Sequence, residues 1–252
     1  MSEPVQDSKY RAPALEKGLD VLELLAMQMR PLNLSQISAE LGRSVSELFR
    51  MVQTLELRGY LVHNGDGYEL TNKLFSLGLS SGPSQNLLAS ALPQMQSLSD
   101  ETRQSCHLAV SSDNLMVVVA RVEAPGALGF SVRVGHIKPL TQTTSGVVLY
   151  AFSAAETQTK WAKKLRTDLN DEEWSGFDKR VHTARANGFA VLKSDYVEAV
   201  TDCSFPIYGQ KGIVAALTMP HLKTYDSVEL SLCQKFIAEK AKLISQSMGA
   251  QL

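Results

Sequence analysis

The chain has 252 residues, of which 44% are hydrophobic, and a formal net charge of −1 at pH 7. A chain of this length suits two domains of about 100–150 residues each. The near-neutral charge balance excludes a chain-wide polyelectrolyte, and the sequence contains no run of about 18 apolar residues that would predict a membrane span.

The N-terminal segment MSEPVQDSKYRAP is polar and lacks the apolar core of a signal peptide, which favours the cytoplasm. Residues 1–12 are expected to form a disordered leader. The cysteines Cys106, Cys203 and Cys233 stand far apart and outside any CxxC or Cys/His cluster. This spacing indicates reduced thiols rather than a disulfide framework or a zinc site, and we expect no metal and no cofactor.

Helices are predicted between Pro13 and Gly59. Pro13 opens a helix that carries Leu15, Leu19, Leu22 and Ala26 on one face. Asn33 with Gln36, and then Ser44 with Glu47, form the patterns of two capping boxes on either side of a break at Gly42. The apolar face of the last helix comprises Val45, Leu48, Phe49, Val52 and Leu55, which leaves Ser46, Glu47, Arg50 and Gln53 on its outward face.

A hairpin is predicted directly after this helix. Gly59 suits a helix C-terminus, and the runs 60–63 and 68–70 flank the turn Asn64-Gly65-Asp66-Gly67. The order of these elements predicts a winged helix-turn-helix domain over residues 13–71, which would place its second paired helix in a DNA major groove. Residues 1–80 contain eight Lys/Arg and ten Asp/Glu, so local contacts rather than net charge must attract the phosphates.

The remainder reads as a second domain. Residues 72–92 are expected to form a linker helix, and Pro93 should bend or restart it. Residues 93–252 are expected to form an α+β domain with a largely antiparallel sheet. The expected strands are 105–110, 115–121, 129–134, 189–193, 203–208 and 213–219, and the expected helices are 144–152, a charged region to 164, 172–187 and 227–248.

Three segments carry a family resemblance. They are LEKGLDVLELL…LSQISAELGRSVSELFRMVQTLELRGYL, SVRVGHIKPLTQTTSGVVLYAF and ARANGFAV…CSFPIYGQKGIVAAL. In this order and at these separations they resemble the IclR family of bacterial transcriptional regulators over nearly the whole chain. The resemblance implies a GAF-like effector-binding domain, a homodimer or homotetramer on double-stranded operator DNA, a small organic acid as effector and control of a catabolic operon.

The candidates for DNA contact lie on the predicted second paired helix, at its start and at the hairpin tip: Arg43, Ser44, Ser46, Arg50, Gln53, His63 and Asn64. Arginine can bind guanine through two hydrogen bonds, glutamine can bind adenine, and a helix start suits a phosphate. Glu47 is expected to serve its capping box instead. A solvated turn is the alternative for His63 and Asn64. The leucines at 15, 19, 22, 74 and 77 suit either a dimer surface or the core.

The candidates for effector contact are Thr143, Thr144, Ser145, Gly146, Asp202, Cys203 and Thr218. The hydroxyls and backbone N–H groups of the first four stand at a predicted helix start, where a carboxylate is favoured. The resemblance places a pocket there and on the strands around Asp202 and Thr218, while a simple helix cap is the alternative. Val147 and Val148 depart from the family pattern. The acidic Asp202 disfavours a bare carboxylate and points toward a hydroxylated acid.

An enzyme is the rival class, because Cys106 stands beside His107 and Cys203 beside Asp202. Adjacent residues of a strand point to opposite faces, so Cys106 and His107 do not form a nucleophile and base pair within a strand. The sequence has no Gly-x-Ser-x-Gly motif, phosphate loop or metal-ligand spacing. We expect no enzyme. A ligand-sensing interaction protein without DNA contact is the other alternative.

Overall fold

In the computed structural model, the described residues are 12–28, 30–79, 82–126, 129–194, 197–224 and 227–251. The chain divides into two compact units between Ser84 and Gln85. The leader expected at residues 1–12 lies outside the described residues, except for Ala12. Within the described ranges, no helix combines the length and the apolar character that a membrane crossing requires.

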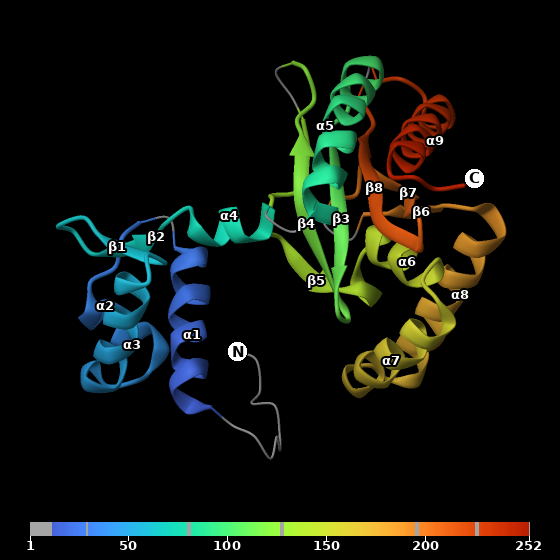
Figure 1. Cartoon of the computed structure of the whole chain (residues 1–252). Helices are drawn as coiled ribbons and strands as arrows, with labels where there is room; N and C mark the ends of the chain where they lie inside the picture. Colours follow the sequence, from blue (N-terminus) through green and yellow to red (C-terminus); the bar gives the residue numbers. More distant parts are fainter. Residues whose placement is uncertain are drawn as a thin grey trace. The chain divides into compact units, whose positions relative to one another are not determined.

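In the described part of the first unit, a set of helices leads into a short hairpin (Figure 1). The elements are α1 (Pro13–Met27), α2 (Leu34–Leu41), α3 (Val45–Leu57), β1 (Leu61–His63), β2 (Tyr68–Leu70) and α4 (Lys73–Leu79). Both predicted capping boxes are confirmed: Asn33 caps α2 with Gln36, and Ser44 caps α3 with Glu47. Gly59 follows α3 with a φ of +73°, the left-handed conformation that suits glycine after a helix.

The core of the first unit lies where α1, α2, α3 and the hairpin meet. Its buried side chains come from all of these elements and from the segment between α1 and α2: Val21, Leu25, Leu32, Ile37, Leu48, Val52 and Leu61. Backbone bonds between Leu32 and Tyr68, at 3.1 and 2.8 Å, tie that segment to β2. The hairpin is therefore fixed to the helices on which it packs.

The apolar faces predicted for α1 and α3 are only partly buried. Leu15 and Leu19 of α1 are 63% and 47% exposed, because α1 turns the side with Val21 and Leu25 toward α2 and α3. Phe49 of α3, expected on the apolar face, is 45% exposed. An apolar stripe in a sequence is wider than the contact that its neighbours make, so the pattern alone does not decide which edge is covered.

In the described residues of the second unit, six strands form one antiparallel sheet with the order β5-β4-β3-β8-β7-β6. The strands are β3 (Cys106–Ser112), β4 (Leu115–Val122), β5 (Ile137–Pro139), β6 (Ala190–Lys193), β7 (Val200–Gly209) and β8 (Gly212–Leu222). This sheet confirms the predicted α+β class. The pairing of β3 with β8 joins segments more than a hundred positions apart, with His107 opposite Thr218.

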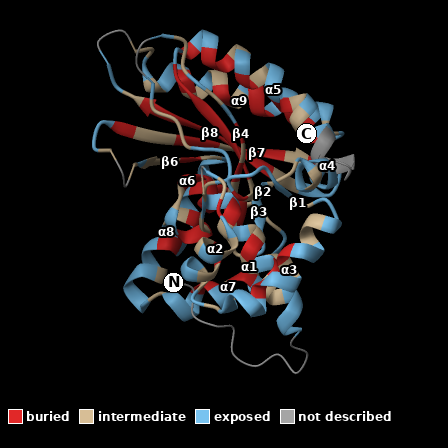
Figure 2. Cartoon of the chain, turned by 90° about the vertical axis from the view of Figure 1, so that its left-hand side faces the viewer, coloured by how far each residue is buried: buried red, intermediate tan, exposed pale blue. Residues whose placement is uncertain are grey.

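Helices cover both faces of this sheet. On one face, α5 (Gly82–Thr102) and α9 (Leu230–Ser247) share an apolar cluster with Leu108 and Leu217. On the other, η1 (Leu140–Gln142), α6 (Thr144–Ala151), α7 (Ala155–Leu165) and α8 (Asp171–Asn187) share a second cluster with Ala109 and Ala216. The short η2 (Arg166–Asp168) follows α7. In Figure 2 the buried positions lie along the strands and on parts of the covering helices.

Some expected boundaries are wrong. Residues 129–134 do not form a strand; the chain reaches β4 at Gly135 and His136, which bond to Val118 at 2.8 and 3.0 Å, and β5 follows. Pro93 does not restart its helix, because α5 continues through it, and the exposed positions of Pro93 and Ala89 leave the lost hydrogen bond to water. The expected linker helix corresponds to α4 and the first half of α5, with residues 80 and 81 outside the described ranges.

Candidate functional site

The helix α3 presents a polar side at the surface of the first unit. Ser46, Arg50 and Gln53 are exposed, whereas Leu48 and Val52 on the opposite side are buried in the core. The outward face predicted from the sequence is therefore the outward face of the folded unit. Such a helix, held by its apolar side and free on its polar side, has the form that enters a major groove.

Two ion pairs join the start of α3 to α1. Lys17 Nζ lies 2.8 Å from Glu47 Oε1, and Arg43 Nη2 lies 2.8 Å from Asp20 Oδ2. The hydrogen bond from Lys17, followed by those from the backbone and hydroxyl of Ser44, lowers the pKa of Glu47 to about 2. Glu47 is thus a negative charge fixed in the capping box, as expected, and Arg43 is half-buried and paired.

The hairpin tip holds its side chains through local hydrogen bonds. Asn64 Nδ2 donates to Glu69 Oε1 at 3.1 Å, and Asn64 Oδ1 accepts from the backbone N–H of Asp66 at 3.2 Å. His63 Nδ1 accepts from the backbone N–H of Gly65 at 3.3 Å. All of these residues are exposed. DNA contact by His63 or Asn64 would therefore have to exchange or supplement these bonds.

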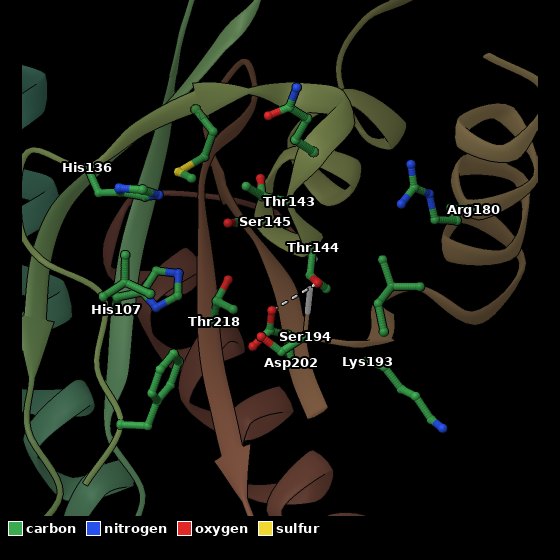
Figure 3. A pocket seen from close by; sticks show the side chains of 15 residues that line it. His107, His136, Thr143, Thr144, Ser145, Arg180, Lys193, Ser194, Asp202 and Thr218 are labelled. Carbon is green, nitrogen blue, oxygen red and sulfur yellow. Dashed lines mark hydrogen bonds between the residues drawn. The ribbon is translucent and has the colours of Figure 1, made fainter. Parts of the chain in front are cut away.

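A cavity in the second unit lies beside the start of α6 (Figure 3). The volume between its lining residues is about 620 Å³, and part of this volume is open to solvent. Of the predicted effector residues, those that line it are Thr143, Thr144, Ser145, Asp202 and Thr218. Segments far apart in the sequence, η1 with α6 and β7 with β8, therefore meet around one space.

Gly146 and Cys203, the other two predicted effector residues, are not among the residues that line this cavity. A Cβ at Gly146 would lie 2.2 Å from the carbonyl oxygen of Leu140, so glycine allows η1 and α6 to approach closely. The Gly146 N–H already donates to Thr143 Oγ1 at 2.9 Å. Cys203 is buried in the cluster with α5 and α9, because successive strand residues alternate and Asp202 takes the cavity side.

Hydroxyl groups bind one another and a carboxylate in the cavity region. Thr144 Oγ1 donates to Asp202 Oδ2 at 3.3 Å, which connects the start of α6 to β7. Behind them, the hydroxyls of Ser204 and Thr218 lie 2.8 Å apart on adjacent strands and are fully buried. Thr143 caps α6. The cap and a cavity lining coexist here, so the two interpretations of this segment are not exclusive.

Two polar side-chain atoms of the lining residues are buried and have no hydrogen-bond partner among the residues that the structure describes: Nδ1 of His107 and Nε of Arg180. Burial lowers the pKa of His107 to about 4, with a smaller contribution from His136. Arg180, on α8, donates from Nη2 to the carbonyl oxygen of Thr141 at 2.9 Å. Buried polar atoms in proteins are usually paired, and an unpaired one calls for an explanation such as a ligand.

Family models match both units of the chain. The model described as "IclR helix-turn-helix domain" matches residues 14–65, and "Bacterial transcriptional regulator IclR C-terminal" matches residues 81–245. The chain belongs to the IclR family of bacterial transcriptional regulators. It is therefore a DNA-binding transcriptional regulator, with a helix-turn-helix unit followed by the C-terminal unit of that family.

Individual IclR relatives are distant. The HTH-type transcriptional regulator KdgR of Escherichia coli is 24% identical over 92% of this chain and 91% of its own length. The p-hydroxybenzoate hydroxylase transcriptional activator of Acinetobacter baylyi is 27% identical over 85% and 82%. A solved IclR homolog from Microbacterium hydrocarbonoxydans, complexed with 4-hydroxybenzoate, aligns with a TM-score of 0.79 at 21% identity, over 94% of this chain and all of that one. At this identity, the likeness to the solved structure supports the fold alone.

Sequence reasoning missed three notable lining residues of this IclR chain: His107, His136 and Arg180. Strand alternation could have predicted the place of His107, because it points away from the cluster that contains its neighbour Cys106. For His136 and Arg180 the sequence offers no comparable signal, since a loop histidine and a helix arginine are ordinary surface residues.

The cysteines of this IclR chain are poor nucleophiles. Burial raises the pKa of Cys106 and Cys203 to about 12, and that of Cys233 to about 11. The thiolate is the reactive form, so at neutral pH these side chains remain buried thiols. The relatives are regulators rather than enzymes, in agreement with this chemistry.

Proposed function

We propose that this regulator reads its operator with the outward side of α3, as a homodimer or homotetramer, and responds to a small organic acid held in the cavity beside α6. The single observation that carries the effector part concerns Arg180, which lines a cavity beside the start of α6. Its Nε is buried and has no hydrogen-bond partner within the described ranges of the chain. The cavity binds its ligand without transforming it, and the operator controls a catabolic operon.

In the DNA-reading step, Arg50 and Gln53 contact base edges and Ser46 contacts a base or a phosphate. All three project from the same exposed side of α3. Arginine and glutamine make paired hydrogen bonds to guanine and adenine in the major groove. His63 and Asn64 of the hairpin tip supplement these contacts on the flanking backbone or minor groove.

Phosphate contacts come from the start of α3. Ser44 stands at its N-cap, where backbone N–H groups and the helix dipole favour an anion. Arg43 adds a charge there once a phosphate oxygen replaces Asp20, 2.8 Å away. Both partners are about one-third exposed, and pairs of this kind contribute only about 0.2–1 kcal/mol, so a phosphate can displace the aspartate.

Apolar side chains on the surface of the first unit support assembly. Leu15 and Leu19 of α1 are 63% and 47% exposed, and Leu74, Phe75 and Leu77 of α4 are 40%, 66% and 51% exposed. One winged module contacts few base pairs, so a two-fold pair supplies both affinity and half-site spacing. We assign these apolar side chains to the interface between copies of the chain.

In the effector step, the cationic Arg180 and the start of α6 attract a carboxylate. The hydroxyls of Thr144 and Ser145 provide hydrogen bonds there, and Asp202 accepts from a hydroxyl of the ligand, which makes a hydroxylated acid the better fit. Among the relatives, one solved structure holds 4-hydroxybenzoate, which is an acid of this class.

The test is a fluorescence-anisotropy titration of the full chain on DNA from upstream of its own gene, with and without a panel of small carboxylic acids. We expect salt-sensitive binding and a change of affinity with at least one acid. Arg180→Met should abolish the acid response and leave DNA binding intact. Lys179→Met, an exposed neighbour on α8, should leave both unchanged.

Two outcomes contradict the proposal. If the protein ignores that DNA at low salt while acids still raise its melting temperature, the operator assignment fails. If no acid changes either the melting temperature or DNA binding, or if Arg180→Met responds like the wild type, the effector assignment fails.

A further inference from the structure

The strand β3 carries a histidine whose role the fold does not explain. His107 is 5% exposed and lines the cavity, and its Nδ1 has no hydrogen-bond partner among the described residues. Its cross-strand neighbour Thr218 is bonded to Ser204 instead. A buried nitrogen without a partner costs stability, because it has lost water and gained nothing. A ligand group that reaches this nitrogen from the cavity would supply the missing bond.

The charge of His107 limits what that ligand group can be. Burial lowers its pKa to about 4, and His136, whose own pKa is lowered by burial and by Lys138, adds to the effect. The imidazole is therefore neutral at pH 7 and offers either a donor or an acceptor at Nδ1, depending on the tautomer. A hydroxyl satisfies both forms, because it can accept and donate. A carboxylate satisfies only one and gains no opposite charge.

The cavity has two chemically different sides. Figure 3 shows His107 and His136 on one side and Arg180 and Lys193 on the other, with Thr144, Thr218 and Asp202 between them. The cations are thus separated from the neutral imidazole. The lining also contains the apolar side chains Met116, Phe130, Val132 and Leu192. A ligand that fits this arrangement has an apolar body with an anionic group toward Arg180 and a neutral polar group toward His107.

We propose that His107 is a specificity-determining residue, whose Nδ1 hydrogen-bonds a hydroxyl on the apolar body of the effector. The effector is then a carboxylic acid whose hydroxyl stands apart from its carboxylate. This assignment rests on the proposed function, since it takes the cavity as the effector site. It adds to Asp202 a second residue that distinguishes a hydroxylated acid from the parent acid of the same shape.

The test compares matched acids on the full chain by isothermal titration calorimetry. The pairs are benzoate with 3- and 4-hydroxybenzoate, and butanoate with 3- and 4-hydroxybutanoate. In the wild type, the hydroxylated member of at least one pair should bind about tenfold more tightly, the factor that one hydrogen bond supplies. In His107→Phe this advantage, taken as the ratio of the two affinities measured on that variant, should fall below about twofold. His107→Gln, which can donate and accept, should restore part of it.

A measurement on the wild type decides the matter even if a variant does not fold. In protein labelled with ¹⁵N-histidine, the Nδ1 resonance of His107 should shift on addition of the favoured hydroxy acid and remain in place with its parent. The inference is overturned if acids bind but no hydroxyl is favoured, if the advantage persists in His107→Phe, or if Nδ1 does not respond. Failure of every acid to bind overturns the proposed effector class itself, which is a different result.

Discussion

Arg43 Nη2 lies 2.8 Å from Asp20 Oδ2, so an arginine at the start of α3 is tied to α1. The same two helices are joined a second time by Lys17 and Glu47. These pairs orient the start of α3, the helix proposed to read DNA, and they also occupy a cation that would otherwise be open to a phosphate. The ion pair with Asp20 therefore fixes the position of Arg43 and at the same time makes it less available to a phosphate.

Asp20→Asn should strengthen DNA binding. The change removes a negative charge from the side proposed to read DNA and releases Arg43 to a phosphate, which corresponds to about a threefold to fivefold gain at low salt. Anisotropy titrations on the upstream DNA measure it, and the double variant Asp20→Asn/Arg43→Ala should lose the gain. Weaker binding by Asp20→Asn would show instead that Arg43 needs the aspartate to hold it in place.

Arg50→Ala should weaken binding to the operator about tenfold or more, because one good base contact contributes about 1–3 kcal/mol. Competition with unrelated DNA separates the two possible roles: a base contact lowers the preference for the operator, whereas a phosphate contact weakens both DNAs equally. Lys163→Ala removes an exposed charge from α7 and serves as the control. An unchanged operator affinity for Arg50→Ala would remove this residue from the interface.

Gly146→Ala should destabilise the second unit, by about 1–3 kcal/mol, because the new methyl group would meet the backbone of Leu140 at 2.2 Å and the backbone cannot give way cheaply. Gly176→Ala is the matched control: it stands within α8 with nothing within 4 Å, and should be neutral or stabilising by up to about 1 kcal/mol. Thermal unfolding followed by circular dichroism compares them. Equal melting temperatures would mean that η1 and α6 are not packed as described.

Acid should destabilise the second unit through His107. Its pKa in the folded state is about 4, below the ordinary 6.5, so the folded state binds fewer protons than the unfolded state between these values. The contribution of His107 to the free energy of unfolding is then fully present above pH 6.5 and is lost as the pH falls toward 4. This loss is on the order of 3 kcal/mol at most. Urea unfolding at pH 7 and at pH 4.5 measures it. His107→Gln should show a smaller difference between the two pH values, and an equal difference would contradict the assignment.

The parts of the site that were predictable are those fixed by short-range rules. The cap at Thr143 and the outward position of Arg50 follow from residues within one or two helical turns, and both are present. The face of the strand on which Cys203 lies was also predictable, because alternation assigns Cys203 and Asp202 to opposite faces. Arg180 was not, since its place in the lining depends on how α8 packs against α6.

The sequence by itself determined the capped helix pair, the hairpin and the antiparallel α+β class, because local hydrogen bonds and the periods of helix and strand select them. Tertiary structure alone decided which side of α1 is buried, where the edge strand β5 lies, and that His107 and Arg180 share a cavity. These features depend on contacts between segments far apart in the chain, such as the pairing of β3 with β8. These contacts are stabilised by the apolar surfaces that the segments bury together, and a local sequence pattern does not show which surfaces those are.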